Sequence, residues 1–283
     1  MDLSYYPGCS LESSAKEFDH SALAVGRTLG INFIELKDWS CCGATSAHGT
    51  NHLLAAALPS RNIAIAQEIG LDLAVPCAAC YGRLKRADHI LRNDQCQRKE
   101  LEEIADFKYS GKVNVMSLLE TFSTRVDPKE ITQCIKKPLE GLKAACYYGC
   151  LLVRPPEVTC FDNPENPQSM DKLIKLTGAE PVRWSYKTDC CGANLSLTSS
   201  QTVVKMVTRL LDMAEEAGAQ ALVTACPLCQ MNLESRRGSR TNMPVFFFTE
   251  LLGLAMGLNE SSKWISKHIV DPLPLLRSLS LVD

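Results

Sequence analysis

The chain has 283 residues, of which 46% are hydrophobic, enough for one large domain or two of ordinary size. Its formal net charge is -2 and it has no long basic run, so we expect no nucleic acid partner. Asp2 argues against a secretory signal, and the longest apolar stretch, residues 244–258, is too short for a bilayer and is interrupted by Glu250. We therefore expect a cytoplasmic protein with no direct membrane span.

The first half of the sequence alternates strand and helix patterns. Apolar runs predict strands at residues 3–6, 31–36, 71–75 and 113–116, and helical periodicity predicts helices at residues 14–29, 58–69 and 79–91. Gly30 and Gly70 are expected to end two of these helices. Pro59 is placed in the first turn of its helix, where a missing N–H costs little.

The second half follows the same plan. Strands are predicted at residues 143–148, 181–185, 219–224 and 245–248, the last as a buried strand rather than a partner surface. Helices are predicted at residues 168–176 and 202–217, and the second of these is amphipathic. Its apolar side consists of Val203, Val207, Leu210, Leu211 and Ala214. Alternating strands and helices predict an α/β fold with a mainly parallel sheet flanked by helices in each half.

A cysteine pattern occurs twice in this frame. It comprises a single cysteine, an adjacent pair followed by glycine, and a Cys-x-x-Cys motif. The first copy is Cys9, Cys41, Cys42, Cys77 and Cys80, and the second is Cys150, Cys190, Cys191, Cys226 and Cys229. The pair and the Cys-x-x-Cys motif are separated by 34 residues in both copies. This repetition predicts two similar domains from an internal duplication, over residues 1–140 and 141–283.

The chemistry of the ten thiols follows from where they lie. Each cysteine group comes shortly after a predicted strand, and in a parallel sheet such positions meet at one edge. Cytosolic thiols at regular spacing indicate metal or redox sites rather than disulfides. A structural zinc ion takes four ligands, so five thiols with an adjacent pair favour an iron–sulfur cluster over the zinc alternative. No glycine-rich dinucleotide motif follows a strand, so electrons are expected from another protein.

The doubled pattern, with Cys-Cys-Gly-Ala in both copies and tyrosines before Cys9 and Cys150, resembles the CCG-domain family, and most of all the B component of heterodisulfide reductase. The resemblance implies two non-cubane [4Fe–4S] clusters, one on each set of five cysteines. It also implies a disulfide substrate between them, such as the mixed disulfide of coenzymes M and B or a bacterial equivalent, which is reduced to two thiols. The implied partners are a flavin-containing subunit (the A component) and a ferredoxin-like iron–sulfur subunit (the C component).

Several assignments stay open at this point. The same motif occurs in electron-transfer subunits of succinate or fumarate:quinone complexes and of lactate-oxidising complexes, which is the alternative function. His48, near Cys42, is a candidate proton donor because imidazole titrates near neutral pH, with a structural histidine as the alternative. Lys187 and Asp189, just before the second cysteine pair, are interpreted as solvated loop residues, with a role in setting the local charge as the alternative. The cysteines outside the repeat are interpreted as packed or surface thiols; they are Cys96, Cys134, Cys146 and Cys160.

Overall fold

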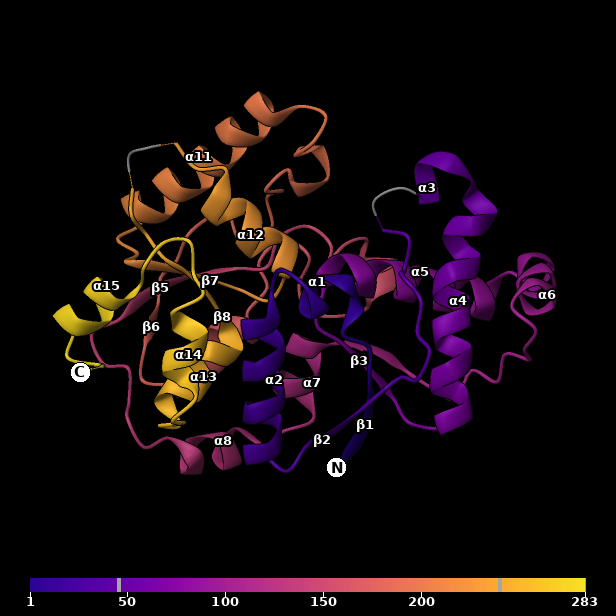
Figure 1. The fold of residues 1–283 in the computed structure, drawn as a ribbon, viewed down its shortest axis with the longest axis horizontal. Coiled ribbons are helices and arrows are strands. Elements are labelled where there is room, and N and C mark those ends of the chain that lie inside the picture. Colours follow the sequence, from indigo (N-terminus) through magenta and orange to yellow (C-terminus); the bar gives the residue numbers. More distant parts are fainter. Residues whose placement is uncertain (45–46, 239–240, 283) are drawn as a thin grey trace.

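The structure, a computed structural model, describes residues 1–44, 47–238 and 241–282, and the side chain of His48 also lies outside the description. It contains two parallel four-stranded sheets (Figure 1). The first has the strand order β2-β1-β3-β4 and the second has the order β6-β5-β7-β8. The two sheets therefore have the same topology, with the second strand of each half at one edge and the fourth at the other. The strands are β1 Asp2–Tyr5, β2 Asn32–Glu35, β3 Leu73–Val75, β4 Val115–Ser117, β5 Lys143–Tyr147, β6 Glu180–Pro181, β7 Ala221–Thr224 and β8 Val245–Phe247. The predicted duplicated α/β fold is confirmed.

Helices flank both sheets. In the first half they are α1 Gly8–Glu12, α2 Lys16–Thr28, α3 Ala47–Thr50, α4 His52–Ile69, α5 Ala78–Asn93, α6 Gln95–Ile104, α7 Leu118–Thr124 and α8 Pro128–Cys134. In the second half they are α9 Pro156–Thr159, α10 Ser169–Leu176, the 3-10 turn η1 Ala193–Leu195, α11 Ser200–Glu216, α12 Pro227–Ser235, α13 Phe248–Ala255, α14 Ser261–Ile265 and α15 Leu273–Ser278. The buried hydrophobic face of α11 is the one predicted from its periodicity. Within the described residues, none of the helices combines the length and the hydrophobicity needed to cross a membrane.

The position predicted for Pro59 is wrong. The helix begins earlier than expected, at His52, so this proline lies inside α4 rather than in its first turn. The side chain of Asn51 caps the helix by accepting a hydrogen bond from the N–H of Leu54, at 3.0 Å. The cap and the leucines and alanines that follow it start the helix before the proline is reached.

The strand predicted at residues 181–185 is also shorter than expected. Only Glu180–Pro181 pairs with β5 as a strand. Val182 still donates a hydrogen bond to the carbonyl of Ala144, at 2.8 Å, after which the chain leaves the sheet toward Cys190. Proline donates no ladder hydrogen bond, which suits Pro181 to an edge strand.

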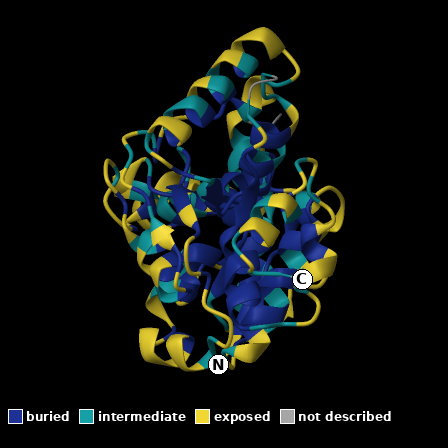
Figure 2. Cartoon of the chain, turned by 90° about the vertical axis from the view of Figure 1, so that its left-hand side faces the viewer, coloured by how far each residue is buried: buried dark blue, intermediate teal, exposed yellow. Residues whose placement is uncertain are grey.

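The two halves pack against each other reciprocally. Helix α2 of the first half packs on α13 of the second, and α10 of the second packs on α7 of the first. Figure 1 shows α2 beside α13 in the middle of the molecule. Phe18 stacks on Phe247 with ring centroids 4.1 Å apart, and the hydroxyls of Ser21 and Thr249 are 2.7 Å apart. The hydrophobic core is therefore continuous across the halves, and Figure 2 shows the buried segments gathered in the interior.

Candidate metal centre

The five cysteines of each copy come together just beyond the carboxyl ends of three strands. In the first half, Cys9 lies in α1 after β1, Cys41 and Cys42 lie in the loop after β2, and Cys77 and Cys80 lie at the start of α5 after β3. In the second half, Cys150 follows β5, Cys190 and Cys191 follow β6, and Cys226 and Cys229 lie at the start of α12 after β7. The arrangement expected from the strand order is thus present in both halves.

Thiols within each set lie in contact. The sulfurs of Cys42 and Cys80 are 3.2 Å apart, and those of the equivalent Cys191 and Cys229 are 3.6 Å apart. Cys77 also hydrogen-bonds Cys226, its equivalent in the other half. The two sets therefore adjoin each other at the contact between the halves.

Hydrogen bonds between thiols shift their protonation. The pKa of Cys42 is lowered to about 7, mainly because of its hydrogen bond with Cys80, with a smaller contribution from the Arg83 guanidinium. The pKa of Cys190 is lowered to about 6, mainly because Cys150 donates to it. Each half thus contains a thiol whose thiolate form is stabilised, and the thiolate is the form that binds metals.

Glycines allow the chain to approach the thiols closely. Gly8 has a φ of 68°, and a Cβ added to it would lie 3.2 Å from the sulfur of Cys80. Gly149 has a φ of 66°, and an added Cβ would lie 3.3 Å from the sulfur of Cys229. A side chain at either position would be strained and would narrow the space around the sulfurs.

Two equivalent tyrosines hold the paired cysteines at the strand edge. The hydroxyl of Tyr6 donates to the carbonyl of Ser40 at 2.8 Å, and that of Tyr147 donates to the carbonyl of Asp189 at 2.6 Å. Each accepting residue immediately precedes a Cys-Cys pair. The sequence reasoning missed this role, although the signal was present, because a tyrosine stands three residues before the first cysteine in both copies.

The sequence also singled out four cysteines outside the repeat, a histidine and a lysine. Cys146 is buried within β5, Cys134 is half-buried at the end of α8, and Cys96 and Cys160 are exposed; among the described residues, none of the four hydrogen-bonds a thiol of either set. The side chain of His48 lies outside the described residues. The prediction that Lys187 is solvated is wrong, because it is buried and its ammonium lies 2.7 Å from the carboxylate of Asp171.

The donor set fits iron–sulfur clusters. Each half gathers five soft thiols against glycine backbone, and the cysteine pairs are adjacent in sequence. Across the parts of the chain that the structure describes, no group of three or more His, Cys, Asp or Glu side chains is arranged around a single metal ion.

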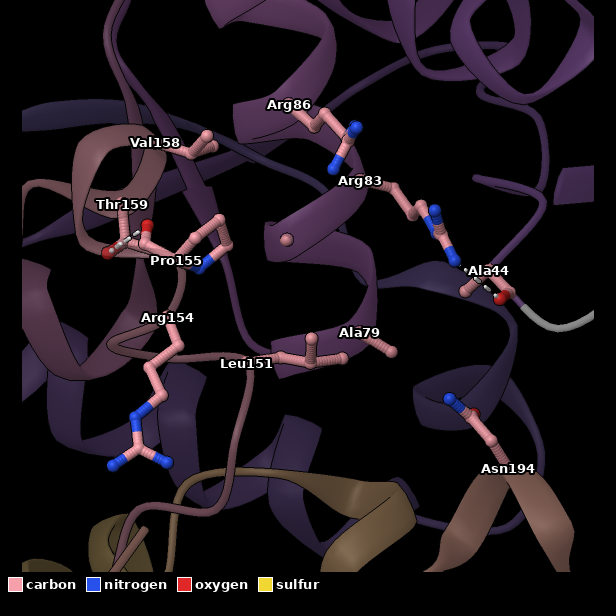
Figure 3. A pocket seen from close by; sticks show the side chains of 11 residues that line it. Ala44, Ala79, Arg83, Arg86, Leu151, Arg154, Pro155, Val158, Thr159 and Asn194 are labelled. Atoms are coloured by element: carbon pink, nitrogen blue, oxygen red, sulfur yellow. Dashed lines mark hydrogen bonds between the residues drawn. The ribbon is translucent and has the colours of Figure 1, made fainter. Parts of the chain in front are cut away.

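A cavity of about 120 Å³ lies where the two halves meet (Figure 3). Its wall includes residues next to the cysteines of both halves, namely Ala44 and Ala79 from the first and Leu151 and Asn194 from the second. A smaller space borders the thiols of the second set directly and shares Ala79, Leu151 and Asn194 with this cavity. A small molecule in the cavity would thus meet both halves.

The profile of the cysteine-rich domain family, CCG, matches residues 3–85 and 144–234, which are the two regions that carry the sets. The chain belongs to the CCG family. Among its relatives, the 8-methylmenaquinol:fumarate reductase membrane anchor subunit of Wolinella succinogenes is 31% identical over 97% of this chain and 99% of its own length. The B component of the ferredoxin/F(420)H(2)-dependent CoB-CoM heterodisulfide reductase of Methanosarcina acetivorans is 28% identical over 98% of this chain and 96% of its own length.

A solved structure shares the fold of this CCG chain. It is the crystal structure of a hypothetical protein from Helicobacter pylori, which superposes with a TM-score of 0.75 at 13% sequence identity. The match covers 95% of this chain and 52% of that one. At this identity the likeness concerns the fold alone.

Proposed function

We propose that this CCG protein is the disulfide-reducing subunit of a heterodisulfide reductase-like complex in the cytoplasm. The observation that carries the proposal is the cavity that both halves line, with residues next to the cysteines of each set in its wall. The relationship to the B component of heterodisulfide reductase supports it. The partners we propose are a flavin-containing subunit (the A component) and a ferredoxin-like iron–sulfur subunit (the C component), because electrons have to be delivered from outside the chain.

The ten thiols of the two sets are proposed to hold two non-cubane [4Fe–4S] clusters. When bound, these clusters would supply one-electron redox chemistry beside the substrate. In the net reaction, R–S–S–R′ takes up two electrons from the partner and two protons, the S–S bond breaks, and RSH and R′SH form. The chain would position the disulfide between Ala79 of the first half and Leu151 of the second, next to the space that the thiols of the second set border. His48 stays a candidate proton donor.

The test is the loss of one cysteine from each set. Cys42→Ala or Cys191→Ala should remove one cluster, so anaerobically purified protein should lose about half of roughly eight irons and of its acid-labile sulfide. Each variant should also lose disulfide-dependent thiol release with reduced viologen as the electron donor. Cys96→Ala is the matched control, because this exposed cysteine lies outside both sets. Full iron content and turnover in either set variant would contradict the proposal.

A second candidate is an electron-transfer subunit of a quinone-linked fumarate reductase. The relative from Wolinella succinogenes favours it, since it is 31% identical over nearly the whole chain. The two functions differ in an observable way. A disulfide reductase releases two thiols per disulfide from small disulfides when only an electron donor is supplied. An electron-transfer subunit instead takes up electrons without thiol release, and it is reoxidised by its partner enzyme with fumarate.

A further inference from the structure

The positive charge in the cavity at the junction of the two halves lies mainly on one side. Three arginines line it, and two of them, Arg83 and Arg86, come from α5 of the first half. Figure 3 shows their side chains leaving the same side of that helix, toward the segment that carries Ala44. Among the residues that the structure describes, Arg83 makes a single, long hydrogen bond of 3.4 Å, to the carbonyl of Ala44. Arg86 has no hydrogen bond or ion pair to any residue that the structure describes.

The equivalent positions of the second half carry no charge. Aligning Cys80 with Cys229 places Asn232 opposite Arg83 and Ser235 opposite Arg86. The side chain of Asn232 is buried and donates to the carbonyl of Cys191 at 2.6 Å. The hydroxyl of Ser235 donates to the carbonyl of Met231 at 2.6 Å. The duplicated fold therefore presents cationic groups to the cavity from α5 and none from the described residues of α12.

The third arginine of the cavity is already engaged by the protein. Arg154 pairs with Glu165 at 2.9 Å, and it donates to the carbonyl of Pro164 and the hydroxyl of Thr188, both at 3.0 Å. Its guanidinium is turned away from Arg83 and Arg86 (Figure 3). The cationic groups left for a ligand are thus on the α5 side.

The space beside these arginines continues outward. A neighbouring pocket of about 250 Å³ between α4 and α5 shares Arg83 and Arg86, and its other walls include His52 and Ile90. A substituent held by the guanidinium groups can therefore extend along α5. The other end of the same ligand then lies at Ala79 and Leu151, beside the second thiol set.

From this asymmetry we propose that Arg83 and Arg86 bind an anionic group on one arm of the substrate and so fix the direction in which its S–S bond lies between the two thiol sets. This inference rests on the proposed disulfide reduction, but binding of an anion at the two arginines can be tested without measuring that reaction. Planar guanidinium groups match a carboxylate, sulfonate or phosphate alike. All three groups would be an anionic substituent on a small disulfide. Arg83 and Arg86 would determine the specificity for that substituent.

Binding is measured first, on the anaerobically purified holoprotein, with thioethers that cannot be reduced. The dianion 3,3′-thiodipropionate should bind at least ~10-fold more tightly than the neutral 2,2′-thiodiethanol, since a hydrogen bond to a charged group is worth about a factor of ten. Arg83→Gln together with Arg86→Gln should abolish this preference and leave binding of the neutral thioether unchanged. Arg27→Gln is the control, because Arg27 lies in the last turn of α2, at the opposite edge of the sheet.

A charge reversal keeps the test informative if the double variant folds poorly. Arg86 is exposed, so Arg86→Glu should fold, and it should bind the cation bis(2-aminoethyl) sulfide more tightly than the wild type does. Competition by inorganic phosphate, and comparison of carboxylate with sulfonate thioethers, distinguish the possible anions. Equal affinity for the dianion in the wild type and both variants would overturn the proposal.

Turnover separates this inference from the function it rests on. For the double variant, the ratio of kcat/KM for 3,3′-dithiodipropionate to kcat/KM for the neutral 2-hydroxyethyl disulfide should fall at least ~10-fold, mostly through the KM of the dianion. If the wild type binds the dianionic thioether but reduces no disulfide, the proposed function fails and the anion site stands. If disulfides are reduced with no dependence on charge, the function stands and the anion site fails.

Discussion

At the scale of single residues, the two tyrosines that hold the Cys-Cys pairs are not equally important. The carbonyl of Ser40 accepts a hydrogen bond from Tyr6 and a second one from the side-chain amide of Asn62, at 2.9 Å. Among the described residues, Tyr147 alone donates a side-chain hydrogen bond to the carbonyl of Asp189. Loss of the hydroxyl should therefore be compensated in the first half and uncompensated in the second.

Tyr147→Phe should release the Cys190–Cys191 loop, while Tyr6→Phe should leave the first loop in place. We expect Tyr147→Phe to lower the free energy of unfolding by about 1 kcal/mol, as for a buried hydrogen bond, and to speed the loss of iron to a chelator. Tyr186→Phe controls for the loss of a hydroxyl that lies outside this contact. The measurement is chelator-induced bleaching of the holoprotein, and faster bleaching in Tyr6→Phe than in Tyr147→Phe would contradict the argument.

At the scale of elements, a buried histidine joins two helices of the second half to the segment that follows α14. The Nδ1 of His268 lies 3.0 Å from Glu234 at the end of α12, and its Nε2 lies 3.1 Å from Glu250 in α13. All three side chains are fully buried, and Glu17 of α2 lies close enough to interact with them electrostatically. The helix that begins at the second Cys-x-x-Cys motif is thereby fixed at its far end.

This cluster makes stability depend on pH. Burial lowers the pKa of His268, but Glu250 and Glu234 raise it more, to about 10, against an ordinary value of 6.5. Because the folded pKa is the higher one, the stabilisation is complete below about pH 6.5 and is lost as the pH rises through about 10.

His268→Gln should therefore lower the free energy of unfolding by about 3 kcal/mol at pH 7, as for a broken buried pair, and by much less at pH 10. Urea unfolding at both pH values measures the difference. His20→Gln is the control, because this histidine is exposed on α2. A loss of equal size at pH 7 and pH 10 would show that the histidine acts by packing rather than by charge.

The elements also show what sequence patterns can and cannot predict. The parallel sheets, the convergence of the cysteine-bearing loops and the apolar face of α11 follow from periodicity and repetition, because each is a local or repeated signal. The start of α4 does not follow, because the Asn51 cap competes with the stronger proline signal at Pro59. The contacts of Lys187 and His268 could not be predicted, since their partners are distant in sequence.

At the scale of the whole molecule, the two halves share one core. The stacked rings of Phe18 and Phe247 lie between α2 and β8, and Phe122 of α7 packs edge-on against Phe248 with centroids 5.7 Å apart. Aromatic rings from both halves thus bury one another. The halves should therefore unfold together, although each has its own sheet.

Phe18→Ala should lower the free energy of unfolding by about 3–5 kcal/mol, because it removes a fully buried ring at the contact between the halves. Phe107→Ala, at a partly buried ring outside this contact, should cost less. Urea unfolding followed by circular dichroism should give a single transition for the wild type. Two separate transitions would show that the halves are independent folding units.

The reciprocal contacts of α2 with α13 and of α10 with α7 carry a consequence for how such a chain can arise. A single half would bear both kinds of surface, so two identical copies could join through an isologous, two-fold symmetric interface. Such a homodimer would have identical sites on either side of its axis. Joining the copies in one polypeptide lifts that constraint, and the difference between Arg83 and Asn232 is a change that only the fused form permits.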